Sequence, residues 1–322
     1  MLFTWKKIWV WISIEDTRWV KKLPIQYWFP RTDHTFFDRA TLEQDSWAID
    51  TILDATNSQI TKKWSEWTIG WQVYPNWIWF FLKALLWNVV SEWNNWIYEH
   101  TFSLLESNTH PTLTIGTNTP LWWNSYSLAM IESMDFRAEV WWKFTVSINI
   151  KAREWENSEN HTITYQDENW FVANMLKVYI ANNIHQLDNA WNICLQSITI
   201  SFKKEIKNIE CISSLNPIDY INTAFSIEWS MELLYENNTY KEDFLNWTSK
   251  ALRIIAEDTL HPYSENEYPS FILDLSKIII TDWTPAFTID DITKQSITFK
   301  GHYDVKSKKA VEIFLKNTQE SY

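Results

Sequence analysis

The sequence predicts a mainly β protein, built from β-sandwich or β-barrel modules with short flanking helices and duplicated in tandem. Apolar and polar residues alternate through 134–140, 144–150 and 225–235, which is the pattern of half-buried strands. The helix predicted at 80–86 is short. The order of predicted elements in the first half of the chain returns in the second half, which indicates an internal repeat.

Tryptophan is abundant and glycine is scarce. The chain has 24 tryptophans and 3 glycines in 322 residues, although glycine alone usually makes up about 7% of a protein. Many of the tryptophans stand where turn glycines belong, because Asn-Trp, Asp-Trp and Trp-Trp occupy the places of Asn-Gly, Asp-Gly and Gly-Gly turns. These dipeptides are at 76–77, 95–96, 122–123, 141–142, 169–170, 246–247 and 282–283.

We infer that the gene uses UGA for glycine and that the printed sequence results from reading UGA as tryptophan. Only Trp28, in Tyr-Trp-Phe-Pro, has the surroundings of a true tryptophan. We therefore expect most tryptophans to lie in turns, at element ends or at the surface, with Trp141 and Trp142 at a hairpin tip. More than half of them in a packed core would contradict the inference, because the core is where tryptophan usually lies. The alternative is a literal, tryptophan-rich carbohydrate-binding β-sandwich, which leaves the turn dipeptides unexplained.

Charge and cysteine content limit the classes of function. A net charge of −12 and a pI near 5.1 argue against a protein that grips nucleic acid, which needs clustered Lys and Arg. Cys194 and Cys211 suit a reducing compartment, and we expect two buried free thiols, with a disulfide across a hairpin as the alternative. We expect no signal peptide, and the longest apolar run, 77–90, is too short to span a bilayer and contains Lys83.

The first half of the chain is predicted to contain short strands around one helix. The helix follows a turn at Pro75-Asn76 and ends at position 87, where a glycine cap is expected. The other predicted elements are a glycine-punctuated arm at 4–20 that packs on something else, a strand within 24–44, a long loop at 45–66, a strand at 68–74, a loop at 88–99, and short strands at 100–105 and 112–115.

The second half begins after the hairpin predicted at 134–150. Residues 151–170 are polar and are expected to be a connector, while 171–184 fit either a helix or a pair of strands. A strand at 198–202 is expected to turn at 203–205 and return through 206–211. The period-two pattern of 225–235 marks a long strand.

The two halves match at a single offset of residue number. The apolar matches are Phe81-Leu82 with Phe244-Leu245, Met134 with Ile297, Phe136 with Phe299, Ile148 with Val311 and Ile150 with Ile313. The repeat predicts a first module with an N-terminal arm at 1–165, a connector at 166–189 and a second module at 190–322.

The residues that commonly carry enzyme chemistry form no recognisable motif. The seven histidines are scattered without metal-ligand spacing, and no nucleophile elbow, phosphate loop or dinucleotide fingerprint is present. Carboxylates such as Asp274, Asp282, Asp290 and Asp291 are unpaired in sequence and fit a solvated face. The sequence therefore predicts no catalytic, cofactor-binding or metal site, and no enzyme.

With glycine in place of tryptophan, residues 11–19 read G-I-S-I-E-D-T-R-G. They resemble the amino-terminal G-I-x-x-E-x-x-x-G signature of the tail tube proteins, or major tail proteins, of long-tailed bacteriophages. Tyr74-Pro75 and 79–87 resemble the strand and the L-K-A-x-L-G block of the same family.

The resemblance continues to the end of the chain. Residues 100–102 and 111–115 resemble the family's H-T-F and P-S-L-T-I segments, with Thr112 in place of the usual serine. The hairpin at 134–150 and the closing segment 311–317 are similar to its terminal strands.

The resemblance implies a virion protein of tail-tube-type modules that stacks as rings into a hollow conduit for DNA ejection. A duplicated chain would need three copies for a pseudo-six-fold ring, and a single module would need six. The expected partners are further copies, the tape measure, terminator and baseplate proteins, and DNA that passes without specific binding. The tail would assemble in the host cytoplasm, with no cofactor and no membrane. A terminator or baseplate protein on the same module is an alternative.

Two sets of residues are candidates for roles in a tube. An acidic lumen would let DNA pass without the affinity that a basic wall creates. The candidates for the lumen are Asp135, Glu139, Glu228 and Glu232, although carboxylates at these positions could equally serve only solubility. The loop 45–66 carries both signs of charge and is the candidate for contact between rings. Its charged residues are Asp45, Asp50, Asp54, Lys62 and Lys63.

Overall fold

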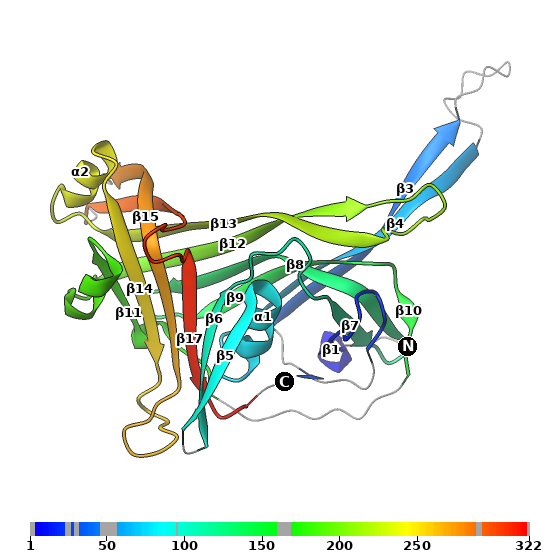
Figure 1. The fold of residues 1–322 in the computed structure, drawn as a ribbon, viewed down its shortest axis with the longest axis horizontal. Coiled ribbons are helices and arrows are strands. Elements are labelled where there is room, and N and C mark those ends of the chain that lie inside the picture. The colour runs from blue at the N-terminus through cyan, green and yellow to red at the C-terminus, as the bar shows by residue number, and fades with distance from the viewer. Residues whose placement is uncertain are drawn as a thin grey trace.

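The computed structural model describes residues 4–22, 27–28, 32–45, 57–94, 96–159, 169–287 and 292–320. They form a mainly antiparallel β structure with short helices, which confirms the predicted fold class (Figure 1). The helices are α1 (Trp77–Leu86) and α2 (Thr239–Leu245), with 3-10 turns at Trp5–Lys7, Ala173–Met175 and Ile184–Asn189. The strands are β1 (Trp9–Ile14), β2 (Tyr27–Trp28), β3 (Asp33–Asp45), β4 (Asn57–Gln72), β5 (Trp87–Asn94), β6 (Ile97–Leu104), β7 (Leu113–Asn118), β8 (Trp123–Glu139), β9 (Thr145–Ala152), β10 (Glu156–Asn157), β11 (Leu176–Ala181), β12 (Leu195–Ile209), β13 (Asp219–Leu234), β14 (Ser249–Glu257), β15 (Ser270–Ala286), β16 (Lys294–Gly301) and β17 (Val311–Asn317).

Eight strands pair side by side in the order β3, β4, β9, β8, β12, β13, β16, β15, and we call them the long sheet. At one end, the β3–β4 hairpin projects from the body of the molecule (Figure 1). A second layer contains β5, β6, β17, the first half of β15, β14 and β11. Because β15 takes part in both, it connects the long sheet with this layer.

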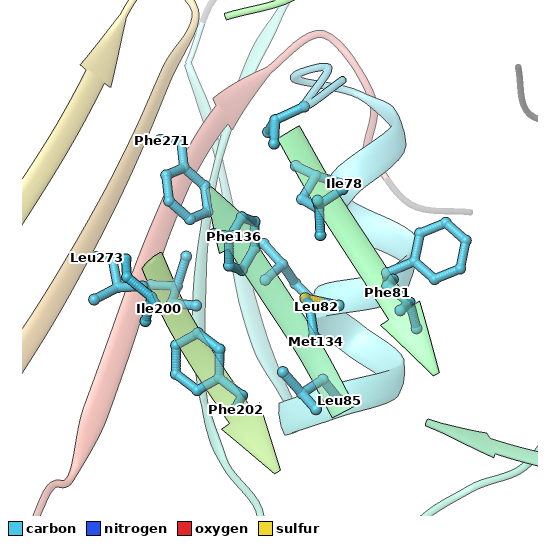
Figure 2. Close-up of a cluster of buried hydrophobic side chains, with 14 of the residues drawn as sticks. Ile78, Phe81, Leu82, Leu85, Met134, Phe136, Ile200, Phe202, Phe271 and Leu273 are labelled. Carbon is cyan, nitrogen blue, oxygen red and sulfur yellow. The ribbon is translucent and has the colours of Figure 1, made fainter. Parts of the chain in front are cut away.

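The core lies between the long sheet, the second layer and α1. Side chains of α1 point toward Met134 and Phe136 of β8 and Ile200 and Phe202 of β12, while Phe271 of β15 approaches from the second layer (Figure 2). All of these side chains are buried. Burying a large apolar side chain contributes about 1.5–3 kcal/mol, so this cluster holds the two halves of the chain together.

The helix α1 begins and ends close to the predicted positions. It follows the turn at Pro75-Asn76 and continues to Leu86, with nine of its ten residues buried. Its end is marked by Trp87, whose φ of 70° lies in the left-handed region that favours glycine. The backbone at position 87 therefore has the conformation of the glycine cap that was expected there.

Several predicted strands are confirmed. The hairpin at 134–150 is formed by β8 and β9, and the long strand at 225–235 is the second half of β13. The N-terminal arm packs on β7 through the buried strand β1. In the segment 171–184, which fitted either a helix or strands, the structure places a 3-10 turn and β11.

Two predicted loops are wrong. The segment 88–99 forms the hairpin β5–β6, which pairs from Trp87 opposite Leu104 to Asn94 opposite Ile97. Residues 57–66 are not a loop, because they form the first part of β4 and pair with β3. The remainder of that predicted loop, 46–56, lies outside the described residues. Exposure explains both errors, since β5 and the outer part of β4 have few buried residues and therefore little of the alternation that reveals a strand.

The predicted turn at 203–205 is also wrong, because β12 continues through it to Ile209. Lys204 is buried and occupies an inward position, so the alternation continues where the sequence reads as three charged residues. The cysteines differ from expectation in burial. Cys194 and Cys211 are free thiols, as expected, but both are exposed, since each lies in a connection outside the core strands.

The pattern of strand pairing occurs twice. The pairs β1–β7, β3–β4, β4–β9, β7–β8, β8–β9 and β8–β10 correspond in order to β11–β14, β12–β13, β13–β16, β14–β15, β15–β16 and β15–β17. The bulges correspond as well, at Thr41/Leu42 and Glu205/Ile206 and at Ile131/Ser133 and Ile280/Asp282. A helix follows β4 in one copy and β13 in the other.

These pairings correct the residue matches of the second half of the repeat. Trp67 corresponds to Trp229 through the shared pairing pattern, but Met134 corresponds to Trp283 and Ile148 to Ile297. The predicted matches of Met134 with Ile297, Phe136 with Phe299, Ile148 with Val311 and Ile150 with Ile313 are therefore wrong. A single offset fails because the hairpin β5–β6 has no counterpart between α2 and β14. The module boundaries at 165 and 190 stay a prediction, and β11 lies in the segment expected to be a connector.

The backbone at several tryptophans has a conformation typical of glycine. Of the eight non-glycine residues with positive φ among those described, five are tryptophan. They are Trp19, Trp87, Trp96, Trp141 and Trp247. L-residues with a side chain avoid this region because Cβ lies too close to the following carbonyl oxygen, whereas glycine has no such cost.

The tryptophans are mostly outside the core. Seven are buried and ten are exposed among the described side chains, so the condition that would contradict the recoding is not met. Trp141 and Trp142, with 96% and 65% of their surface exposed, lie at the tip of the β8–β9 hairpin as predicted. The buried indole N–H groups of Trp67 and Trp229 have no hydrogen-bond partner among the described residues, which is a cost that glycine would not carry.

Candidate functional site

The long sheet has one apolar and one polar face, and the four predicted acidic residues share the polar one. Pairing places Asp135 of β8, Ser201 of β12 and Glu228 of β13 in one row across three adjacent strands. A second row, four residues further along β8, contains Glu139 and Glu232, with a serine of β12 between them. Residues that are far apart in sequence thus form one acidic group on one surface.

The charge of this polar face is mixed. Lys203 lies 3.1 Å from a carboxylate oxygen of Glu228, and Lys294 lies 3.8 Å from one of Glu232. The Ser201 hydroxyl donates a hydrogen bond to Asp135. Arg137, between the two acidic rows on β8, adds another positive charge. The face is therefore polar with paired carboxylates, and it is less acidic than the net charge of the chain suggests.

The predicted contact loop is distributed along the β3–β4 hairpin. Asp45 ends β3 and accepts a hydrogen bond from the backbone N–H of Asn57 at 2.7 Å. Lys62 and Lys63 lie nearer the body on β4, where they form ion pairs with Glu210 and Glu154. Asp50 and Asp54 lie outside the described residues. The described members of the set are thus on one hairpin but do not form one cluster.

A buried carboxylate that sequence reasoning did not single out holds the N-terminal arm in place. Glu15 accepts hydrogen bonds from the Thr114 hydroxyl at 3.0 Å and from the backbone N–H groups of Trp19 and Leu128, each at 2.8 Å. Burial raises the pKa of Glu15, although these hydrogen bonds oppose the shift. Glu15 stands in the 11–19 segment that carries the family resemblance, which is the one signal that could have identified it.

Arg18, in the same segment, extends this attachment to the second half of the chain. It forms an ion pair with Asp219 and donates a hydrogen bond of 2.7 Å to the carbonyl oxygen of Tyr220. The two side chains, Glu15 and Arg18, thus connect the arm with β7, β8 and β13. All the contacts described for these two side chains are within the protein, and they hold the arm against the strands.

A second buried polar group lies beneath α1. The Lys204 ammonium is 3.1 Å from the carbonyl oxygen of Ala84, in the last turn of α1, and 2.9 Å from Nδ1 of His110. His110 in turn contacts the Leu105 carbonyl oxygen through Nε2 at 3.0 Å. Burial lowers the pKa of Lys204 to about 7, and burial together with the charge of Lys204 lowers the pKa of His110 to about 4.

The structure also has a cavity of about 600 Å³ between the β8–β9 hairpin tip and the strands β11 and β12. Its lining is mainly apolar and includes Trp141, Trp142 and Trp170. Glu139 is also among the lining residues. The three indoles in this lining could stack on a ligand.

The described residues contain no group of His, Cys, Asp and Glu side chains that could hold a metal ion. Neither of the helices in the described ranges has the length and apolarity needed to cross a membrane. No protein-family model matches the chain, and no curated protein matches it.

Proposed function

We propose that the chain is the protomer of a phage tail tube, which stacks as rings into a hollow conduit for DNA ejection. The observation that carries this proposal is the duplicated strand pattern, which builds one eight-stranded sheet with an edge strand at each end. Among the described residues, 35–41 of β3 pair only with β4, and 282–286 of β15 pair only with β16.

Open edges of this kind favour self-association. Unpaired backbone N–H and C=O groups on an edge strand offer a template for another strand, and closure into a ring removes both edges at once. Because each chain already contains two copies of the unit, three chains would give a pseudo-six-fold ring. A ring of six chains is the other stoichiometry compatible with stacking.

In this proposal the polar face of the long sheet lines the tube. Asp135, Glu139, Glu228 and Glu232 then face the lumen. The lysines beside Glu228 and Glu232 offset part of the negative charge of this wall. A wall without a basic surplus releases few counterions from DNA, so the duplex passes without strong binding. The projecting β3–β4 hairpin, with Asp45, Lys62 and Lys63 along it, is the proposed contact with the next ring.

The proposal includes glycine at most positions printed as tryptophan. Five left-handed tryptophans and the Asn-Trp and Trp-Trp turns support it. Mass spectrometry of a native peptide spanning 136–151 decides the matter. Glycine at 141 and 142 is the expected result, and tryptophan there would refute the recoding.

A carbohydrate-binding β-sandwich is the second candidate, and the cavity lined by Trp141, Trp142 and Trp170 favours it. Aromatic rings that line an apolar cavity can stack on sugar rings. This function requires literal tryptophan, so the same peptide measurement separates it from the tube.

Negative-stain microscopy of the purified protein tests the tube directly. We expect rings and long hollow tubes from the chain carrying the residues that mass spectrometry identifies. Particles that stop at a single ring would indicate a terminator instead, and a protein that stays monomeric at high concentration would refute self-assembly.

A further inference from the structure

The pairing of β8 with β12 joins the two copies of the repeated unit within one chain. It runs antiparallel from Ser133 opposite Lys203 to Glu139 opposite Ser197. The contact is therefore a template for how one copy of the unit meets the next.

Among the described residues, the second copy lacks the equivalent neighbour. The second half of β8 has β9 on one edge and β12 on the other. The second half of β15 has β16 on the corresponding edge, and on the other edge its pairing with β14 ends at Ile279. By the repeat, the missing strand is the counterpart of β12, which is β3.

From this template we propose that β3 of one chain pairs antiparallel with residues 282–286 of β15 in a second copy, in the register that β12 adopts with β8. The inference rests on the proposed self-assembly, and it adds the surfaces and the register. The shared bulges align Ser133 with Asp282 and Lys203 with Arg39. The register then places Arg39 opposite Asp282, Phe37 opposite Thr284 and Thr35 opposite Ala286.

Charge supports this register. Arg39 and Asp282 are both exposed and lie on the polar faces of their strands. Directly opposite residues of opposite charge stabilise an antiparallel pair, and like charges destabilise it. The corresponding pair within the chain, Lys203 opposite Ser133, has no such match. Pro285 has no backbone N–H, so at that position β15 cannot donate a hydrogen bond to the neighbouring strand.

The two helices differ in burial, as the proposed pairing of β3 with β15 of a second copy predicts. In the first copy, α1 is covered by side chains of β8 and of β12, the neighbouring copy's strand (Figure 2). In the second copy, α2 has no buried residue, and its Leu245 is 63% exposed. Phe287, the counterpart of buried Ala138, is 74% exposed. A second chain's β3 would cover this side of the molecule as β12 covers α1.

Engineered cysteine pairs test the register. Phe37→Cys with Thr284→Cys reproduces between chains the internal pair Ser201 and Asp135, whose side chains contact each other. The background carries Cys194→Ser and Cys211→Ser, because both native thiols are exposed. Thr35→Cys with Ala286→Cys is a second pair in the same register, in case the first variant folds poorly.

Two controls accompany these variants. Ser201→Cys with Asp135→Cys should form a disulfide within one chain and reports folding and oxidation. Phe37→Cys with Ala286→Cys keeps the same face but is two residues out of register. Diagonal neighbours lie roughly 7–8 Å apart, beyond the roughly 3.5–4.5 Å between Cβ atoms that a disulfide needs.

Oxidation of the assembled protein should give disulfide-linked multimers for both in-register pairs, up to the number of chains in one closed ring. The shifted pair should give few linked multimers. Tubes that form without these multimers, or with equal amounts from the shifted pair, would overturn the register and leave the tube intact. Linked rings that never stack would support the strand pairing and refute the tube. A protein that stays monomeric would refute both.

Discussion

At the scale of single residues, five tryptophans have the positive φ that favours glycine. Trp87 at the end of α1 and Trp141 at the hairpin tip both have left-handed backbone conformations. Both positions were predicted for glycine from the turn and helix-cap pattern alone. The left-handed conformation of Trp19 was not predicted, because no turn dipeptide precedes it.

Replacing a left-handed tryptophan by glycine should stabilise a chain made with literal tryptophan. Trp141→Gly should raise the free energy of unfolding by about 1 kcal/mol, since the left-handed conformation costs roughly that much for a residue with a side chain. Urea denaturation measures the change. Trp191→Gly is the matched control, because Trp191 is 91% exposed without positive φ and should lose stability slightly or stay the same. Equal effects at both positions would contradict the backbone argument.

The buried Lys204 should make stability depend on pH. Its pKa is about 7 in the folded chain, below the ordinary 10.5, so the unfolded chain binds more protons between these values. The free energy of unfolding should therefore rise as the pH is raised from 7 to 9. Lys204→Met should flatten this rise, measured as urea midpoints at both pH values.

Lys203→Met serves as the control for that measurement, since Lys203 is exposed on the opposite face of β12. It should leave the pH dependence intact. If the free energy of unfolding of Lys204→Met still rises between pH 7 and 9, the pH dependence comes from other groups, such as the α-amino group.

At the scale of elements, the sequence predicted strands with one buried face and missed strands without one. The alternation of β8, β9 and the end of β13 identified them. The strand β5 and the outer part of β4 are exposed over most of their length, so the segments that contain them were taken for loops. In β12, charged side chains on successive residues concealed a continuous strand, because Lys204 is buried through hydrogen bonds that only the folded chain supplies.

The different burial of α1 and α2 gives a paired prediction. Leu82→Ala should cost about 2–5 kcal/mol, as expected for a fully buried leucine. Phe244, like Leu82, is the sixth residue of its helix but is only half-buried, so Phe244→Ala should cost less in a single chain. The measurement is the free energy of unfolding of both variants under conditions that keep the protein monomeric. A larger loss for Phe244→Ala would contradict the assigned burial.

In the assembled protein, Phe244→Ala should have an effect beyond its small loss of stability in the single chain. If a second copy covers α2, this variant should weaken assembly, measured as the protein concentration at which particles form. An unchanged concentration would argue against coverage of α2 between chains.

At the scale of the whole molecule, the repeat was visible in the sequence but its alignment was not. Element order indicated the duplication, whereas one fixed offset paired β9 with β17 where the structure makes β16 its counterpart. The acidic residues were identified one by one from strand alternation. Their arrangement in two rows depends on the pairing of β8 with β12, between strands about sixty residues apart in sequence, which alternation cannot supply.

The buried groups around Glu15 and Lys204 show the same limit. Each depends on partners from distant strands, such as Thr114 and Leu128 for Glu15. A single sequence indicates that these residues are polar but not that they are enclosed. The structure therefore supplies the pairing of distant strands, which the local sequence pattern does not contain.

Cryo-electron microscopy of the assembled particle tests the central proposal most directly. We expect a hollow tube of stacked rings, with β8, β12 and β13 forming its inner wall and Asp135 and Glu228 facing the lumen. A particle without a channel, or a tube in which this polar face lies on the outer surface, would contradict the account.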